Sequence, residues 1–235
     1  MLPDQRTAPA ASSGGNTDFP ASPHPGNGLA TSSLDTVEAS ARLTGMLGLI
    51  LMVGLLVEGV TLLSIRHLVV VHIIVGLLLV PATLLKLGSV WFRFASYYAH
   101  HPEFRRAGPP SPLLRLMGPV VVASTVLLFA SGIWLAAIGP GKPTLAAAIH
   151  KASFVIWFGA MSVHVLGHLR ELPRTAFGDW ITRGGRRVVM AGHALTPVRG
   201  TLGRAVAVVS AVGLGIALTI ASGKIAQPWH LWGGG

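Results

Sequence analysis

Long apolar runs without Lys, Arg, Asp or Glu dominate this chain. They occupy residues 43–57, 68–85, 116–141, 152–169 and 205–223. Most of them reach the roughly 18 to 20 residues that an α-helix needs to cross about 30 Å of hydrocarbon. The runs show no alternation of apolar and polar positions, which excludes a transmembrane barrel, and only helices and closed barrels span bilayers. We therefore predict an all-α integral membrane protein.

The limits of the runs predict the domain organisation. The first residues are rich in Pro, Ser, Gly, Ala and Thr and lack apolar periodicity, which is typical of a disordered tail. We expect five transmembrane helices, four in a bundle and one additional, near residues 41–64, 68–94, 115–138, 145–169 and 203–222. The expected parts are a disordered cytoplasmic tail at 1–40, a transmembrane domain at 41–222 with a basic cytoplasmic loop at 170–202, and an extracytoplasmic tail at 223–235.

The distribution of basic residues predicts the orientation. The chain has a formal net charge of +10, and its arginines concentrate in the N-terminal tail and in the second and fourth loops. By the positive-inside rule these segments are cytoplasmic, which makes the protein a multi-pass protein of the plasma membrane with an extracytoplasmic C-terminus. The charge therefore indicates topology and not a nucleic-acid partner. We interpret the arginine-rich segment 170–204 as a contact with anionic membrane lipid.

Two residue pairs share one spacing. His72 and Lys86 lie fourteen residues apart in one apolar run, and His150 and His164 lie fourteen apart in another. Fourteen residues of α-helix rise about 21 Å and return to within roughly 40° of the starting direction, so each pair lies on one helix face. Both helices enter from the outer side in the predicted topology. We expect His72 and His150 at the outer level, with Lys86 and His164 at the inner level.

A pair of histidines at one level of a helical bundle favours haem. Ionisable groups within hydrocarbon are costly, so a functional role is the first hypothesis, ahead of simple packing. Two neutral imidazoles that face each other across a bundle commonly hold the iron of haem b from both axial sides. We predict that His72 and His150 ligate one haem b near the outer face. Zinc is a weaker alternative because a closed site needs four ligands, although Glu58 adds one oxygen. The absence of cysteine excludes thioether-linked haem and iron–sulfur clusters held by cysteine.

A distinctive set of positions surrounds these histidines: His72, Gly76, Pro81, Lys86, Arg93, Tyr97 and Tyr98, then His150 to Phe154 and Val163 to His168. Together they resemble small actinobacterial membrane cytochromes of the b561-like type. The resemblance covers about residues 65–170. It implies a haem-binding four-helix bundle that passes electrons between the quinone pool and a partner, with some relatives serving extracytoplasmic molybdopterin oxidoreductases.

The chain departs from the two-haem pattern of many such cytochromes at Lys86, which occupies the place of a fourth histidine. A deprotonated lysine could ligate iron, so a second haem between Lys86 and His164 is an open alternative. Otherwise Lys86 anchors a haem propionate, a quinone head-group or a partner on another helix. His168 offers a different inner ligand or a proton relay. One haem is our prediction.

Three charged residues near the outer level are predicted to support the site. Arg66 and Lys151 lie beside the proposed ligands, where they would neutralise haem propionates, or else they mark helix ends by extending toward the interface. Glu58 is predicted to lie in a quinol site, because quinol oxidation releases protons that a carboxylate accepts. The alternative for Glu58 is an ion pair with Arg66 or Lys151.

Two classes of function follow. The first is a cytochrome b that transfers electrons between quinone and an extracytoplasmic redox protein. We expect it to be a subunit of an oxidoreductase complex rather than a stand-alone enzyme. A stand-alone superoxide oxidase or metal reductase is a variant of this first class. The second is a haem-independent transporter or scaffold whose His and Lys residues line an ion path. No dinucleotide-binding fingerprint is present. Small residues in the first and fifth helices permit a homodimer.

Overall fold

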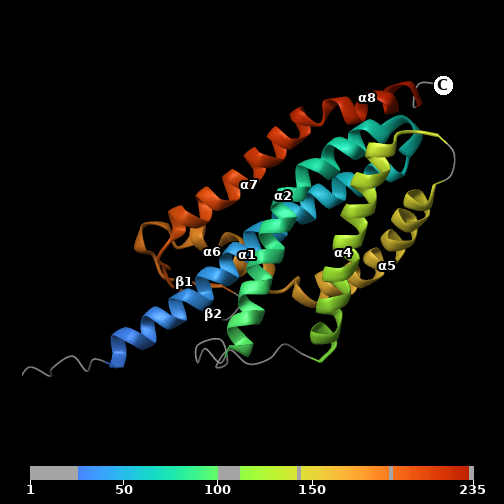
Figure 1. The fold of residues 1–235 in the computed structure, drawn as a ribbon. Coiled ribbons are helices and arrows are strands. Elements are labelled where there is room, and N and C mark those ends of the chain that lie inside the picture. The colour runs from blue at the N-terminus through green and yellow to red at the C-terminus, as the bar shows by residue number, and fades with distance from the viewer. Residues whose placement is uncertain (1–25, 100–111, 142–143, 191–192, 233–235) are drawn as a thin grey trace, which may run out of the picture.

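The computed structural model describes residues 26–99, 112–141, 144–190 and 193–232 (Figure 1). Five of its helices are long and apolar enough to cross a membrane, which confirms the predicted all-α membrane fold with five spans. The long helices are α1 (Gly26–Leu62), α2 (Ile65–Tyr98), α4 (Pro112–Ile138), α5 (Leu145–His168) and α7 (Thr201–Ala221). The short elements are α6 (Leu172–Ile181), the 3-10 helix η1 (Arg183–Gly185), β1 (Val188–Met190), β2 (His193–Leu195) and α8 (Gly223–Trp232).

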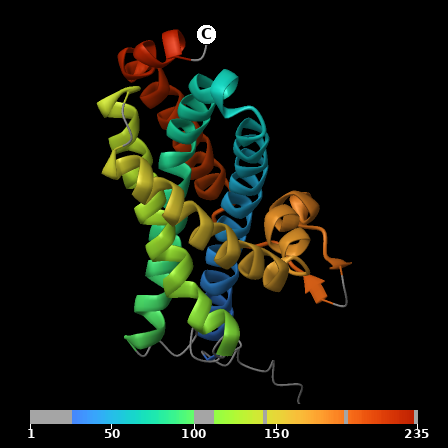
Figure 2. The ribbon, with the colours of Figure 1, turned by 90° about the vertical axis from the view of Figure 1, so that its right-hand side faces the viewer.

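The long helices form two packed groups that meet at α2 (Figure 2). α1, α2 and α7 pack around a core cluster of Leu47, Leu51, Leu79, Ala82 and Val208. α4 and α5 pack mainly against each other, and α4 contacts α2. α7 lies against α2 and not against α4 or α5 as its main partner. Many outward side chains are apolar and exposed, as the lipid-facing surface of a membrane protein requires.

Two glycines allow the close approach of helices in the first group. Gly54 of α1 lies beneath the side chain of Leu79, and a Cβ atom there would overlap its methyl groups. Gly215 of α7 lies directly against the backbone carbonyl of Leu78, so a side chain at this position would push α7 away from α2. Small residues at such crossings stabilise membrane helices because they bring backbones into van der Waals contact.

The helix ends separate by charge. One end of the bundle contains the start of α1, the end of α2 and the start of α7, near Arg42, Arg93 and Arg204, and we call it the basic end (Figure 1). The other end contains the turn between α1 and α2, the connection between α4 and α5, and α8. There the indole Nε1 of Trp229 donates to the carbonyl of Ala136 at 3.2 Å, which ties α8 to α4. The assignment of the basic end to the cytoplasm stays a prediction.

Three segments contain more structure than the sequence indicated. The predicted disordered tail is helical from residue 26 to residue 40, as the start of α1, while residues 1–25 lie outside the described part. The segment 170–202 contains α6, η1 and an antiparallel hairpin that pairs Val188 with Leu195. The C-terminal segment forms α8. The reason is tertiary: α6 packs on α1 and α8 packs on α2, and these contacts stabilise short helices whose own sequences are weak signals.

A buried ion cluster attaches α6 and the hairpin to the bundle. The carboxylate of Asp179 in α6 accepts from Arg42 at 2.9 Å and from Arg204 through two bonds of 2.6 Å. Arg42, of which 1% is exposed, also donates to Thr182 Oγ1 at 3.2 Å and to the carbonyl of Thr196 at 2.7 Å. Each charge thus has a hydrogen-bonded partner, which is the condition for burying ions at all.

Candidate functional site

His72 and His150 lie side by side although seventy-eight residues of chain separate them. Their ring centres are 6.3 Å apart, with an angle of 77° between the ring planes. His72 belongs to the second turn of α2, and His150 belongs to the second turn of α5, so both lie at the end of the bundle opposite the basic end. Both side chains are half-buried.

The ring of His150 is fixed by α4. Its Nδ1 lies 3.1 Å from the backbone carbonyl of Leu128 and 3.3 Å from Ser131 Oγ. A carbonyl oxygen can only accept, so Nδ1 carries the proton and donates to Leu128. The lone pair of the neutral imidazole is then on Nε2, and the described residues offer no hydrogen bond to that nitrogen. His150 therefore presents a basic nitrogen to its surroundings.

The ring of His72 is fixed by α1 in the same manner. Its Nδ1 lies 2.6 Å from Glu58 Oε2 and 2.9 Å from Thr61 Oγ1. The Thr61 hydroxyl donates to the backbone carbonyl of Glu58 at 2.6 Å, so its oxygen is free to accept. With Glu58 as the acceptor of this pair, the proton again lies on Nδ1 and the lone pair on Nε2. Glu58 is buried, and its carboxylate is turned toward His72 instead of toward Arg66 or Lys151.

Glycines make room for the imidazole of His150 and for the Glu58 carboxylate beside His72. A Cβ atom at Gly132 of α4 would lie 2.9 Å from Cε1 of His150, closer than real Cβ contacts. A Cβ atom at Gly76 of α2 would lie 3.1 Å from Glu58 Oε1. Gly132 therefore allows α4 to pass the imidazole of His150, and Gly76 gives the Glu58 carboxylate its place between α1 and α2.

Both imidazoles have a hydrogen bond on the nitrogen that a metal would leave free. Histidines that ligate a metal usually donate their other N–H to a carboxylate or a backbone carbonyl, which fixes the tautomer and the ring orientation. His72 has the carboxylate of Glu58, and His150 has the carbonyl of Leu128. No group of three metal-ligating side chains occurs among the described residues. A closed four-ligand zinc site is therefore not formed by this part of the chain.

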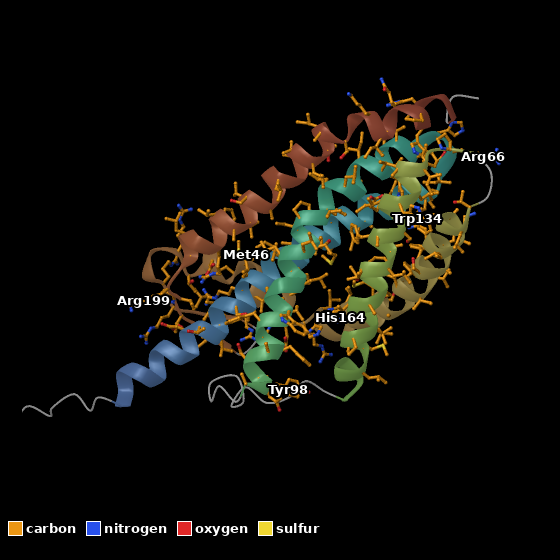
Figure 3. All side chains as sticks on the ribbon, in the orientation of Figure 1. Met46, Arg66, Tyr98, Trp134, His164 and Arg199 are labelled. Atoms are coloured by element: carbon orange, nitrogen blue, oxygen red, sulfur yellow. The ribbon has the colours of Figure 1, made fainter. Side chains whose placement is uncertain are left out.

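The inner residues lie close enough for their charges to interact. Lys86 of α2 and His164 of α5 interact electrostatically, and Lys86 Nζ donates to the backbone carbonyl of Thr44 in α1 at 3.0 Å. Nδ1 of His164 is buried and has no hydrogen-bond partner among the described residues. The rings of His164 and His168 have centres 4.8 Å apart, and Nδ1 of His168 is 3.9 Å from Glu171 Oε2. Figure 3 shows His164 well removed from Arg66 and Trp134, which mark the other end.

The two predicted propionate partners lie at the proposed level but make no ion pair there. Arg66 in the first turn of α2 and Lys151 beside His150 are both exposed. Neither has a carboxylate within ion-pair distance among the described residues. Both side chains are thus available to an anionic group at this end of the bundle, and their predicted role stays a prediction.

Several residues that build the site were missed by sequence reasoning. The sequence could have identified Thr61, because it follows Glu58 by three residues and so lies on the same helix face. Gly132 also had a signal, as a glycine inside an apolar run of α4. Leu128 had none, since it contributes through its backbone carbonyl. Asp179 and Glu171 are the two acidic residues within the arginine-rich segment 170–204, and an acidic residue there is a signal for an ion cluster in a membrane protein.

Comparisons with protein-family models, with curated proteins and with solved structures gave no match to this chain. The class that the fold defines is a multi-pass helical membrane protein with five candidate spans. The resemblance to b561-like cytochromes therefore rests on the residues that carry it and stays a prediction.

Proposed function

We propose that this protein is a membrane cytochrome b in which Nε2 of His72 and Nε2 of His150 ligate the iron of one haem b. The observation that carries the proposal is the shared state of the two rings. Each Nδ1 is hydrogen-bonded to a group that can only accept, and the ring centres are 6.3 Å apart. Two histidines that only pack against each other need not both have the lone pair on Nε2, and they need not leave it without a hydrogen-bond donor.

The separation of the rings fits a shared metal ion. Imidazole nitrogens bind metal ions at about 2.0–2.1 Å, so two rings on opposite sides of one ion have centres roughly 6 Å apart. The observed 6.3 Å agrees with that distance. The half-buried position of both rings leaves them accessible to a cofactor that enters between the helices.

When bound, haem b would supply reversible one-electron transfer at its iron. The protein residues have separate tasks. Glu58 and Thr61 hold the proton of His72 on Nδ1 and orient its ring. The Leu128 carbonyl does the same for His150. These hydrogen bonds raise the basicity of both Nε2 atoms, which strengthens binding of oxidised iron.

The position of His72 and His150 along the bundle supports electron exchange on one particular side of the membrane. Both histidines lie at the end opposite the basic end, and the positive-inside rule assigns that end to the extracytoplasmic side. Electrons at this level are accessible to an extracytoplasmic redox protein, such as a molybdopterin oxidoreductase, and the quinone pool is the membrane-soluble counterpart. We propose that the chain is the haem subunit between the two, with Arg66 and Lys151 as partners of the propionates.

The test is the haem content of purified ligand variants. We expect His72→Ala and His150→Ala each to lose the visible absorption of haem b, because six-coordinate binding needs both nitrogens. The matched control is His230→Ala, since His230 is exposed on α8, away from both ligands, and its removal should leave the spectrum unchanged. Full haem content and an unchanged spectrum in both ligand variants would overturn the proposal.

A rescue experiment separates ligand loss from misfolding. In His150→Gly, added imidazole should enter the vacated space beside Gly132 and restore the low-spin spectrum. Failure of imidazole to restore it in a variant that still elutes as a folded protein would count against direct ligation. A wild-type protein that binds no haem but conducts ions in vesicles would establish the transporter alternative.

A further inference from the structure

A second polar cluster lies nearer the basic end, and the proposed haem site does not use it. We call Lys86 and His164 the inner cluster. Lys86 projects from α2 toward α1, where its Nζ donates to the Thr44 carbonyl at 3.0 Å, and it interacts electrostatically with His164 of α5. The cluster therefore draws one residue from each of the two groups of helices.

The inner cluster has unused hydrogen-bonding capacity. An ammonium group has three protons, and the described residues provide one acceptor for them, the carbonyl of Thr44. His164 Nδ1 is buried and is the one such side-chain atom without a partner in the described part of the chain. Buried polar atoms are nearly always hydrogen-bonded, so an unpaired one beside a partly paired cation indicates an absent partner.

Neighbouring charges do not supply that partner. Arg93, two helical turns beyond Lys86, adds a second positive charge, and the carboxylates of Glu38 and Glu171 interact with Arg93. Glu171 also lies 3.9 Å from His168 Nδ1. No carboxylate is within ion-pair distance of Lys86 among the described residues. The missing partner must carry an acceptor oxygen and must come from outside this part of the chain.

The surroundings restrict what that partner can be. Lys86 and His164 both lie within apolar spans, and Gly48 of α1 leaves Lys86 Nζ room, since a Cβ atom there would lie 3.0 Å from it. A molecule that reaches them through the lipid must be largely apolar and have a small polar head. We propose that the inner cluster binds the head-group of a quinone, with Lys86 donating to one quinone oxygen and His164 Nδ1 hydrogen-bonding to the head-group.

This inference rests on the proposed function, because a cytochrome b that exchanges electrons with quinone needs such a site. The quinone site is then at the inner cluster and not at Glu58, whose carboxylate is paired with His72. Quinone and haem would then occupy different levels of the same helices, fourteen residues or about 21 Å apart along α2. The position near the basic end assigns quinone binding to the side that the positive-inside rule predicts to be cytoplasmic.

The test is direct binding of menadione, a small naphthoquinone, to the full chain in detergent, measured by titration calorimetry. We expect Lys86→Met and His164→Leu each to weaken binding roughly tenfold, because each removes one charge-assisted or buried hydrogen bond. The matched controls are Lys224→Met and His230→Leu, which change exposed residues of α8 and should bind as the wild type does.

The haem-free variant His72→Ala separates this inference from the proposed function. We expect it to bind menadione with the wild-type affinity, since the inner cluster is not part of the haem site. Unchanged affinity in both Lys86→Met and His164→Leu would overturn the quinone site and leave the haem proposal standing. Two haems per wild-type chain, one of them lost in Lys86→Met, would also overturn it and would assign the inner cluster to a second haem.

Discussion

Glu58 Oε2 and His72 Nδ1 are 2.6 Å apart, between adjacent helices of the membrane domain. The pair connects the carboxylate of α1 with a proposed haem ligand of α2. In metal sites, a carboxylate on the far nitrogen of a histidine raises the basicity of the ligating nitrogen. We propose from this contact that Glu58 positions His72, which differs from the quinol-site role predicted from the sequence.

We expect Glu58→Gln to raise the midpoint potential of the haem. The amide still accepts the hydrogen bond of Nδ1 but lacks the negative charge, so oxidised iron is stabilised less than in the wild type. A spectroelectrochemical titration measures the shift. The control is Glu171→Gln, a change at an exposed carboxylate near the basic end.

The same variant separates the two roles of Glu58. A shifted potential with unchanged menadione affinity supports positioning of His72. An unchanged potential together with slower reduction of the haem by quinol would restore the quinol-site prediction and contradict the positioning role.

Gly132→Ala should reduce haem binding without unfolding the chain. The added methyl group would lie 2.9 Å from His150 Cε1, so either the ring or α4 must move. Overpacking of this kind costs about 1–3 kcal/mol, which is enough to lower haem occupancy measurably. Gly118→Ala in the same helix is the control, because a Cβ atom there meets nothing within 4 Å. Equal haem content in the two variants would contradict the close fit of α4 against His150.

Asp179→Asn should destabilise the protein by about 3–5 kcal/mol, since it leaves two buried arginines without their shared carboxylate. Only 8% of the Asp179 side chain is exposed, and it joins Arg42 and Arg204 from different helices. Unfolding in mixed detergent micelles measures the change. Glu171→Gln should alter stability by less than about 0.5 kcal/mol, because its side chain is largely exposed. A similar small effect of Asp179→Asn would show that the cluster does not stabilise the fold.

The contribution of Asp179 should also depend on pH in a defined direction. Burial alone would raise the pKa of this carboxyl, but hydrogen bonds and charge from Arg204 and Arg42 outweigh burial and lower the pKa below its ordinary value of 3.8. A lowered folded-state pKa means that the stabilisation is fully present above about pH 4 and is lost as the pH falls through the folded-state value. The stability difference between wild type and Asp179→Asn should therefore be constant from neutral pH to about pH 5 and shrink below pH 4. A difference that grows on acidification would contradict this sign.

The sequence was sufficient for features that depend on local pattern. The five spans followed from apolar runs long enough to cross a bilayer, and the meeting of His72 with His150 followed from spacing on two parallel helices. It could not supply contacts that depend on how helices pack. The Leu128 carbonyl, the space at Gly132 and the burial of Arg42 against Asp179 arise between segments far apart in the chain. The helical state of α6 likewise depends on its packing against α1, which composition does not encode.

If His72 and His150 hold one haem b, the visible spectrum of the detergent-purified wild-type protein must show it. A dithionite-reduced minus oxidised spectrum with sharp b-type bands, together with one haem per chain by pyridine haemochrome, is the predicted result. A protein that stays colourless after expression with added haem would contradict the claim, and ion transport would then be the function to test.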